Sequence, residues 1–121
     1  MKFLLDESLP QKLRNDFGNT HEIWTVKDKG WLGKKNGELL KLLSENNFDF
    51  FITIDRNLPY QQNTERLPFT IYVLCAANNR YETLKNLIPL IFENINRGNF
   101  KNIIEISLFD KLVLMCSFFV C

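Results

Sequence analysis

Short apolar segments alternate with amphipathic or polar segments along the chain, and this alternation is the feature that most constrains the fold. The expected strands are residues 3–5, 21–26, 50–54, 69–74 and 103–106. Each connection between them contains a helix or a segment of helix length, which parallel strand pairing requires. The pattern therefore predicts a single-domain, mostly parallel five-stranded α/β sheet with helices on both faces.

The helical segments carry their own start and stop signals. An apolar face at four-residue spacing, with Pro10 in its first turn, predicts a helix after the first strand. Asn36 is the expected N-cap of the next helix, and Asn79 opens a capping-box pattern before the longest one. Pro89 should kink or divide that last helix, and Gly98 should end it.

Charge and cysteine content bound the functional class. Fifteen basic and 14 acidic residues nearly cancel, so no global basic excess indicates a nucleic-acid-binding protein. A local candidate is the loop containing Lys34 and Lys35, although a solvated charged loop explains the same run. The three cysteines form no CxxC pair, which fits a reducing compartment. Because no signal peptide or membrane-spanning segment is indicated, we expect a cytoplasmic protein.

Carboxylates follow two of the expected strands directly. Asp6 and Glu7 come after the first strand, and Asp55 comes after the third. With the strand order 2-1-3-4-5, ligands of an open parallel sheet bind beyond the carboxyl ends of the strands, in the crevice between strands one and three. We therefore expect Asp6 and Asp55 to face each other there. The alternative is that each acid merely caps the helix that follows it.

Two carboxylates held that close destabilise each other unless they share a proton or a cation. With no cysteine or second histidine nearby, the available ligands are oxygen atoms, which favours Mg²⁺ or Mn²⁺. Glu38 is a candidate third ligand, although the dipole of the helix it begins also explains an acid there. Asn57 is a candidate amide ligand or an ordinary turn residue.

Three separated stretches resemble a known group of proteins. They are LLDESLP at 4–10, GWLGKKNGELL at 30–40 and TIDRNLPYQQN at 53–63. Together, and in this order, they resemble the small PIN-like proteins of the domain-of-unknown-function 5615 (DUF5615) group, which are often linked to bacterial toxin–antitoxin systems. The resemblance covers roughly residues 1–107 and leaves an apolar C-terminal tail, residues 108–121, unaccounted for.

The resemblance implies a PIN-like fold and metal-dependent hydrolysis of RNA. By position, Asp6, Glu38 and Asp55 are then the acids that bind Mg²⁺ or Mn²⁺, and Thr53 is a supporting hydroxyl. The common pattern has a fourth acid where this chain has Asn57, and an uncharged ligand should weaken metal binding. The resemblance also points to further residues lining the site: Asn36, Arg56, Tyr60, Gln61, Gln62 and Asn63. Of these, an arginine can hold a phosphate and a tyrosine can stack on an unpaired base.

Three classes of function stay open. The leading hypothesis is a metal-dependent ribonuclease, the toxin of a toxin–antitoxin pair, whose nearby lysines guide the RNA backbone. A receiver-like phosphoacceptor is disfavoured, because Cys75, Ala76 and Ala77 stand where that class needs a Ser or Thr. A catalytically degenerate domain that binds RNA or protein is the third class. The apolar tail should pack on its own sheet, join a homodimer interface or bind an antitoxin.

Overall fold

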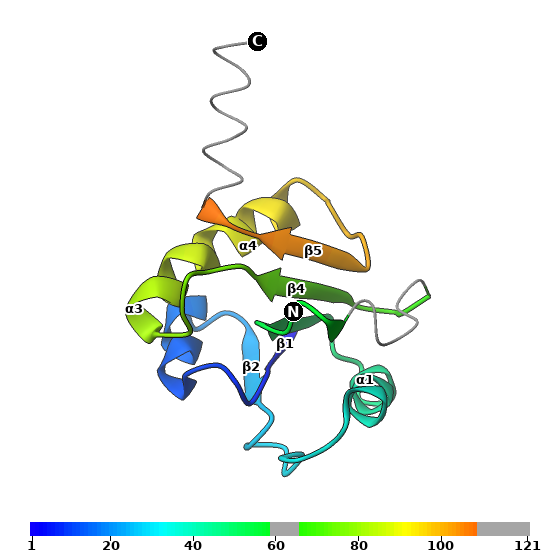
Figure 1. Cartoon of the computed structure of the whole chain (residues 1–121). Helices are drawn as coiled ribbons and strands as arrows, with labels where there is room; N and C mark the ends of the chain where they lie inside the picture. The colour runs from blue at the N-terminus through cyan, green and yellow to red at the C-terminus, as the bar shows by residue number, and fades with distance from the viewer. Residues whose placement is uncertain (59–65, 109–121) are drawn as a thin grey trace.

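Five parallel strands form the centre of the molecule (Figure 1). The structure is a computed structural model and describes residues 1–58 and 66–108. The strands are β1 (Lys2–Leu5), β2 (Glu22–Thr25), β3 (Phe50–Thr53), β4 (Thr70–Leu74) and β5 (Ile103–Ile106). They lie in the order β2-β1-β3-β4-β5, and each neighbouring pair is parallel. The predicted parallel sheet is therefore confirmed, and its strand order is the one assumed for the expected site.

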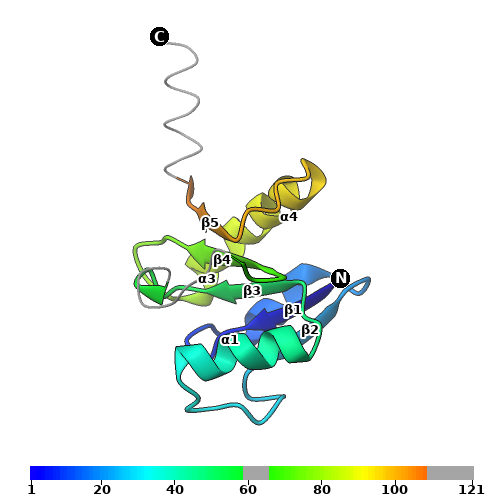
Figure 2. The same ribbon diagram turned by 90° about the vertical axis from the view of Figure 1, so that its right-hand side faces the viewer.

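Helices cover both faces of this sheet, as the sequence predicts (Figures 1 and 2). One face packs against α1 (Asn36–Glu45). The opposite face packs against the 3₁₀ helix η1 and the helical run α3, η2 and α4. Their bounds are η1 (Gln11–Phe17), α3 (Tyr81–Leu84), η2 (Lys85–Leu87) and α4 (Ile88–Asn96).

Strand residues alternate between these two layers, because successive side chains of a strand point to opposite faces of the sheet. In β3, Phe50 and Ile52 belong to the core beneath α3 and α4, whereas Phe51 belongs to the core beneath α1. Every residue of β3 and β4 is buried. Burial on both faces explains why these strands read as continuous apolar runs rather than as alternating ones.

Aromatic rings fill the core on the α4 side. The ring of Phe3 lies 5.2 Å from that of Phe17, 4.9 Å from that of Phe50 and 5.9 Å from that of Phe92, measured between centroids. These four rings come from β1, η1, β3 and α4. One aromatic cluster therefore packs the first and the last helix of this layer against the sheet. Ring pairs at such distances stabilise beyond the area they bury.

The helix ends differ from the expectation at three places. The segment after β1 is a 3₁₀ helix, and Pro10 precedes it as the N-cap residue instead of lying in its first turn. Asn36 is the first residue of α1, and Lys35 is the N-cap. Arg80 is the N-cap of α3, without the side-chain hydrogen bond of a capping box. Asn78 instead accepts a hydrogen bond from the Arg80 backbone N–H at 3.0 Å, which fixes the turn before the helix.

The two predicted breaks in the last helical segment are confirmed. The segment passes through η2 and restarts as α4 with Pro89 in the first turn, where its missing N–H is not needed. After α4, Gly98 adopts a positive φ of 72°. Its N–H donates to Ile95 O at 3.0 Å, and the Asn99 N–H donates to Asn94 O at 3.1 Å. This pair of bonds is the glycine-dependent helix stop known as the Schellman motif.

Two groups of sequence expectations fall outside the described residues. They are the apolar tail, apart from Leu108, and the loop residues Tyr60, Gln61, Gln62 and Asn63. Within the described ranges, no helix has both the length and the apolar character that a membrane crossing needs.

Tyr72 gives a direct test of the core. Its side chain is fully buried, and its hydroxyl has no hydrogen-bond partner among the described residues. The same burial raises the pKa of Tyr72 to about 12. An unpaired buried polar group costs about 1–3 kcal/mol, so Tyr72→Phe should raise the free energy of unfolding by about 1 kcal/mol. Urea denaturation checks this, and a loss of stability would show that the hydroxyl has a partner.

Candidate active site

Asp6 and Asp55 lie at the carboxyl edge of the sheet, at the ends of two adjacent strands. The register pairs Leu5 with Ile52, and the Asp6 N–H extends this ladder by donating to Ile52 O at 3.0 Å. Asp6 therefore stands beside Thr53, the last residue of β3, and Asp55 follows two residues later. Parallel pairing of β1 with β3 is what brings residues 49 positions apart in sequence to one edge.

The hydroxyl of Thr53 connects the two acids. It donates a hydrogen bond to Asp6 Oδ2 at 2.7 Å and accepts one from the backbone N–H of Asp55 at 3.1 Å. Thr53 is fully buried, so its hydroxyl has to find its partners inside the protein. A single side chain thus orients one carboxylate and fixes the backbone that carries the other.

The Asp6 carboxylate also accepts hydrogen bonds from its own turn. The Glu7 N–H donates to Oδ1 at 2.8 Å, and the Ser8 hydroxyl donates to Oδ2 at 3.2 Å. Burial nevertheless raises the pKa of Asp6 above its ordinary value of 3.8, because desolvation outweighs the opposing effect of these hydrogen bonds and that of Thr53. The negative charge of Glu7 raises this pKa further. A cation beside Asp6 would offset the cost of its buried charge.

Asp55 is held by two asparagines. Its Oδ1 accepts the Asn57 N–H at 2.9 Å, and its Oδ2 accepts the Asn36 side-chain amide at 3.4 Å. Because Asn36 is the first residue of α1, its bond joins the start of that helix to the end of β3. The sequence indicated Asn36 only as a cap and, through the resemblance, as a residue lining the site. The structure brings it to Asp55 directly.

Glu38 lies in the first turn of α1 and is exposed to solvent. Within residues 1–58 and 66–108, no three His, Cys, Asp or Glu side chains come together in a group that could hold a metal ion. The structure therefore does not assemble Asp6, Glu38 and Asp55 into a three-acid cluster. The helix dipole accounts for an acid at this position, and a role for Glu38 as ligand or base stays a prediction.

The oxygen ligands available at this edge of the sheet suit a hard divalent cation. Mg²⁺ is commonly bound by one or two carboxylates together with water and substrate phosphates, rather than by a complete cage of protein ligands. Asp6 and Asp55 supply two carboxylates, and the Thr53 hydroxyl beside Asp6 supplies a neutral oxygen atom. Asn57 contacts Asp55 through its backbone N–H, so a role of its side chain as a ligand stays a prediction. This donor set suits Mg²⁺ or Mn²⁺ and contains no thiol or imidazole that would favour Zn²⁺.

The predicted RNA-binding residues fall into two groups. Lys34 and Lys35 are exposed in the loop that leads directly to Asn36, and Arg56 is exposed next to Asp55. Arg56 therefore adjoins Asp55 along the chain, and the two lysines precede Asn36, whose side chain bonds to Asp55. Tyr60, Gln61 and Gln62 lie outside the described residues.

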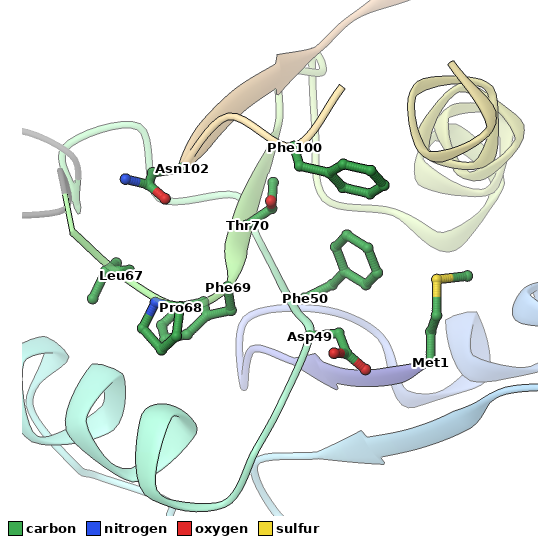
Figure 3. A pocket seen from close by; sticks show the side chains of 9 residues that line it. All are labelled: Met1, Asp49, Phe50, Leu67, Pro68, Phe69, Thr70, Phe100 and Asn102. Carbon is green, nitrogen blue, oxygen red and sulfur yellow. The ribbon is translucent and has the colours of Figure 1, made fainter. Parts of the chain in front are cut away.

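A hollow of about 390 Å³ also opens at the opposite, amino edge of the sheet (Figure 3). Met1, Phe50 and Phe100 line it together with Asp49, the one acid among the described residues around it. Oδ2 of Asp49 accepts the Lys2 backbone N–H at 2.8 Å, so this carboxylate extends the pairing of β1 with β3. This hollow lacks the paired carboxylates of the carboxyl edge and is not part of the candidate site.

Replacing Thr53 tests its role as the link between the acids. Thr53→Val keeps the shape of the side chain but leaves the Asp55 N–H without its acceptor, which should cost about 1–3 kcal/mol of stability. It should also raise the pKa of Asp6 further, since the Thr53 hydrogen bond lowers it. Thr53→Ser, which keeps the hydroxyl, should leave that pKa near the parent value. Carboxyl ¹³C NMR titration measures it, and equal pKa values in both variants would contradict the link.

The raised pKa of Asp6 predicts a pH dependence of stability in metal-free buffer. The folded state binds the Asp6 proton more tightly than the unfolded state, so this residue's contribution to stability falls as pH rises from about 3.8 through the folded-state pKa. Above that pH window the loss of stability is complete and constant. Asp6→Asn removes the titrating carboxyl group, so the free energy of unfolding of the variant should rise relative to that of the parent as the pH increases across the window. Parallel pH profiles of the two proteins would contradict the shift.

Comparison with known proteins assigns no family to this site. No protein-family model, no curated protein and no solved structure matches the chain. The resemblance to the PIN-like DUF5615 group therefore stays a prediction from its three motifs, and the function rests on the chemistry of the site.

Proposed function

We propose that this protein is a Mg²⁺- or Mn²⁺-dependent ribonuclease whose reaction takes place at Asp6 and Asp55. The observation that carries the proposal is the joining of these two acids through the Thr53 hydroxyl, at the edge where open parallel sheets bind their ligands. The three-motif resemblance supports RNA as the substrate and an antitoxin protein as the partner. Both belong to the proposal.

Each residue of the proposed site has a separate role in binding the metal ion or the RNA. Asp6 and Asp55 hold the cation, and Thr53 keeps the Asp6 carboxylate in one orientation. When bound, the cation supplies Lewis acidity at the phosphate and lowers the pKa of a bound water. Lys34 and Lys35 attract the phosphate backbone. Asn57 adds no charge at the site, so metal affinity is lower than four acids would give.

A non-catalytic RNA-binding domain is the second candidate. It is favoured by the absence, within the described ranges, of any group of three acids that could hold a metal. The exposed cations beside the site, Lys34, Lys35 and Arg56, serve RNA binding whether or not cleavage occurs. Cleavage and metal binding therefore have to be measured separately.

The decisive experiment measures both on the purified full chain. A single-stranded RNA labelled at one end should be cleaved with Mn²⁺ and stay intact with EDTA. Asp6→Asn and Asp55→Asn should lose this cleavage. In thermal denaturation, Mn²⁺ at 100 times its dissociation constant should stabilise the parent by about 2.7 kcal/mol, or several degrees, and should stabilise the two variants less.

Asp49→Asn is the matched control. It removes the same charge at the opposite edge of the sheet and should keep both the cleavage and the full Mn²⁺ effect. If Asp6→Asn and Asp55→Asn also keep the full thermal shift, the ion binds elsewhere and the proposed site is wrong. If Mn²⁺ stabilises the protein through these acids but RNA is never cleaved, the non-catalytic function holds instead.

A further inference from the structure

A pocket of about 400 Å³ opens at the carboxyl ends of β3 and β4. It is distinct from the carboxylate site, and the sequence motifs do not predict it. The lining residues come from the end of β3, from the end of β4 and from the turn before α3: Ile54, Arg56, Leu74, Ala76, Asn78 and Asn79.

The pocket and the acids share the end of β3 but lie toward opposite layers. Thr53 continues the alternation of Phe51, which faces α1, and Asp55 bonds to Asn36 of that same helix. Ile54 continues the alternation of Ile52 and packs against the core on the α4 side. A strand of nucleic acid crossing this edge therefore meets the carboxylates with one part and the pocket with the next.

The pocket has apolar walls and a polar rim. Leu74 is buried, and Ile54 and Ala76 are half-buried against the same core. Asn78, Asn79 and Arg56 are exposed around them. Asn78 uses Oδ1 to accept the Arg80 N–H, and this bond does not involve the N–H groups of its side-chain amide.

We propose that this pocket binds one unpaired base of an RNA strand whose neighbouring phosphodiester lies at Asp6 and Asp55. The apolar walls contact the face of the base, and the side-chain amides of Asn78 and Asn79 hydrogen-bond its edge. The guanidinium of Arg56 holds the phosphate of that nucleotide. The inference rests on the proposed function for its substrate class and extends it to the residues that select the nucleotide.

Charge and size both favour a nucleotide. Arg56 is the one charged residue among the described residues lining the pocket, so the pocket is suited to an anionic ligand. A volume of about 400 Å³ falls within the usual range for small-ligand pockets. Two amides offer both donors and acceptors, as recognition of a base edge requires, whereas a purely electrostatic phosphate site needs none.

The test uses ¹⁵N-labelled protein in EDTA, titrated with each of the four ribonucleoside 5′-monophosphates and followed by NMR. Binding should shift the backbone signal of Ala76 and the side-chain amide signals of Asn78 and Asn79, and one or two of the four nucleotides should bind best. Shifts confined to other parts of the protein, or no shift with any nucleotide, would overturn the proposal.

Substitutions locate the binding in the pocket. Ala76→Phe fills it and should weaken binding of a short single-stranded RNA in EDTA by about tenfold. Ala77→Phe, at an exposed neighbour that does not line the pocket, is its matched control and should bind like the parent. Asn79→Leu should weaken binding by about threefold to tenfold, and Arg56→Gln by about tenfold or more. Because Asn79 and Arg56 are exposed, these two variants decide the question if Ala76→Phe does not fold.

Asp55→Asn separates this proposal from the ribonuclease proposal. If it abolishes cleavage while the nucleotide shifts at Asn78 and Asn79 persist, both proposals hold. If nucleotides bind in the pocket but the parent cleaves no RNA, the pocket stands and the catalytic function fails. If the parent cleaves RNA and Ala76→Phe, Asn79→Leu and Arg56→Gln all bind it as the parent does, the pocket proposal fails alone.

Discussion

The parallel pairing of β1 with both β2 and β3 is the constraint on which the rest of the structure depends. Parallel neighbours cannot be joined by tight turns, so each connection must cross a face of the sheet and carry a covering segment with it. The connection to β2 covers one face with η1, and the connection to β3 covers the other with α1. The same pairing brings the end of β1 beside the end of β3, and this is the only reason that Asp6 meets Thr53.

The Thr53 hydroxyl fixes the position of both acids through its hydrogen bonds to the Asp6 carboxylate and the Asp55 backbone. A carboxylate that is largely removed from water is costly, and hydrogen bonds from Thr53, Ser8 and the Glu7 backbone recover only part of the cost, since the pKa of Asp6 stays raised. Asp55 is held differently, by Asn36 and the Asn57 backbone. The two acids therefore have unlike environments, and a cation between them would gain most from Asp6.

The two faces of the sheet give the carboxyl edge two different chemistries. On the α1 side of the end of β3, Asp55 bonds to Asn36. On the α4 side, Ile54 lines the pocket together with Arg56, Asn78 and Asn79. Thr53 contacts Asp6 and Ile54 lines the pocket, so adjacent residues at the end of β3 serve both. The proposed metal site and the proposed nucleotide pocket thus share the end of one strand.

The sequence by itself determined the parallel sheet and the edge at which both aspartates lie, because strands buried on both faces are continuous apolar runs joined by segments of helix length. The strand order was only assumed from the sequence, and the tertiary structure decided it. The sequence also determined the breaks at Pro89 and Gly98, which follow from backbone geometry. The helix caps were less well determined, since the N-cap residues of α1 and α3 are Lys35 and Arg80 and not the expected asparagines. Only the tertiary structure decided that Asn36 reaches Asp55, that Glu38 is exposed and that Asn78 and Asn79 line one pocket with Arg56. These outcomes depend on how helices sit on the sheet, and no local pattern encodes the distance between residues that are far apart in the chain.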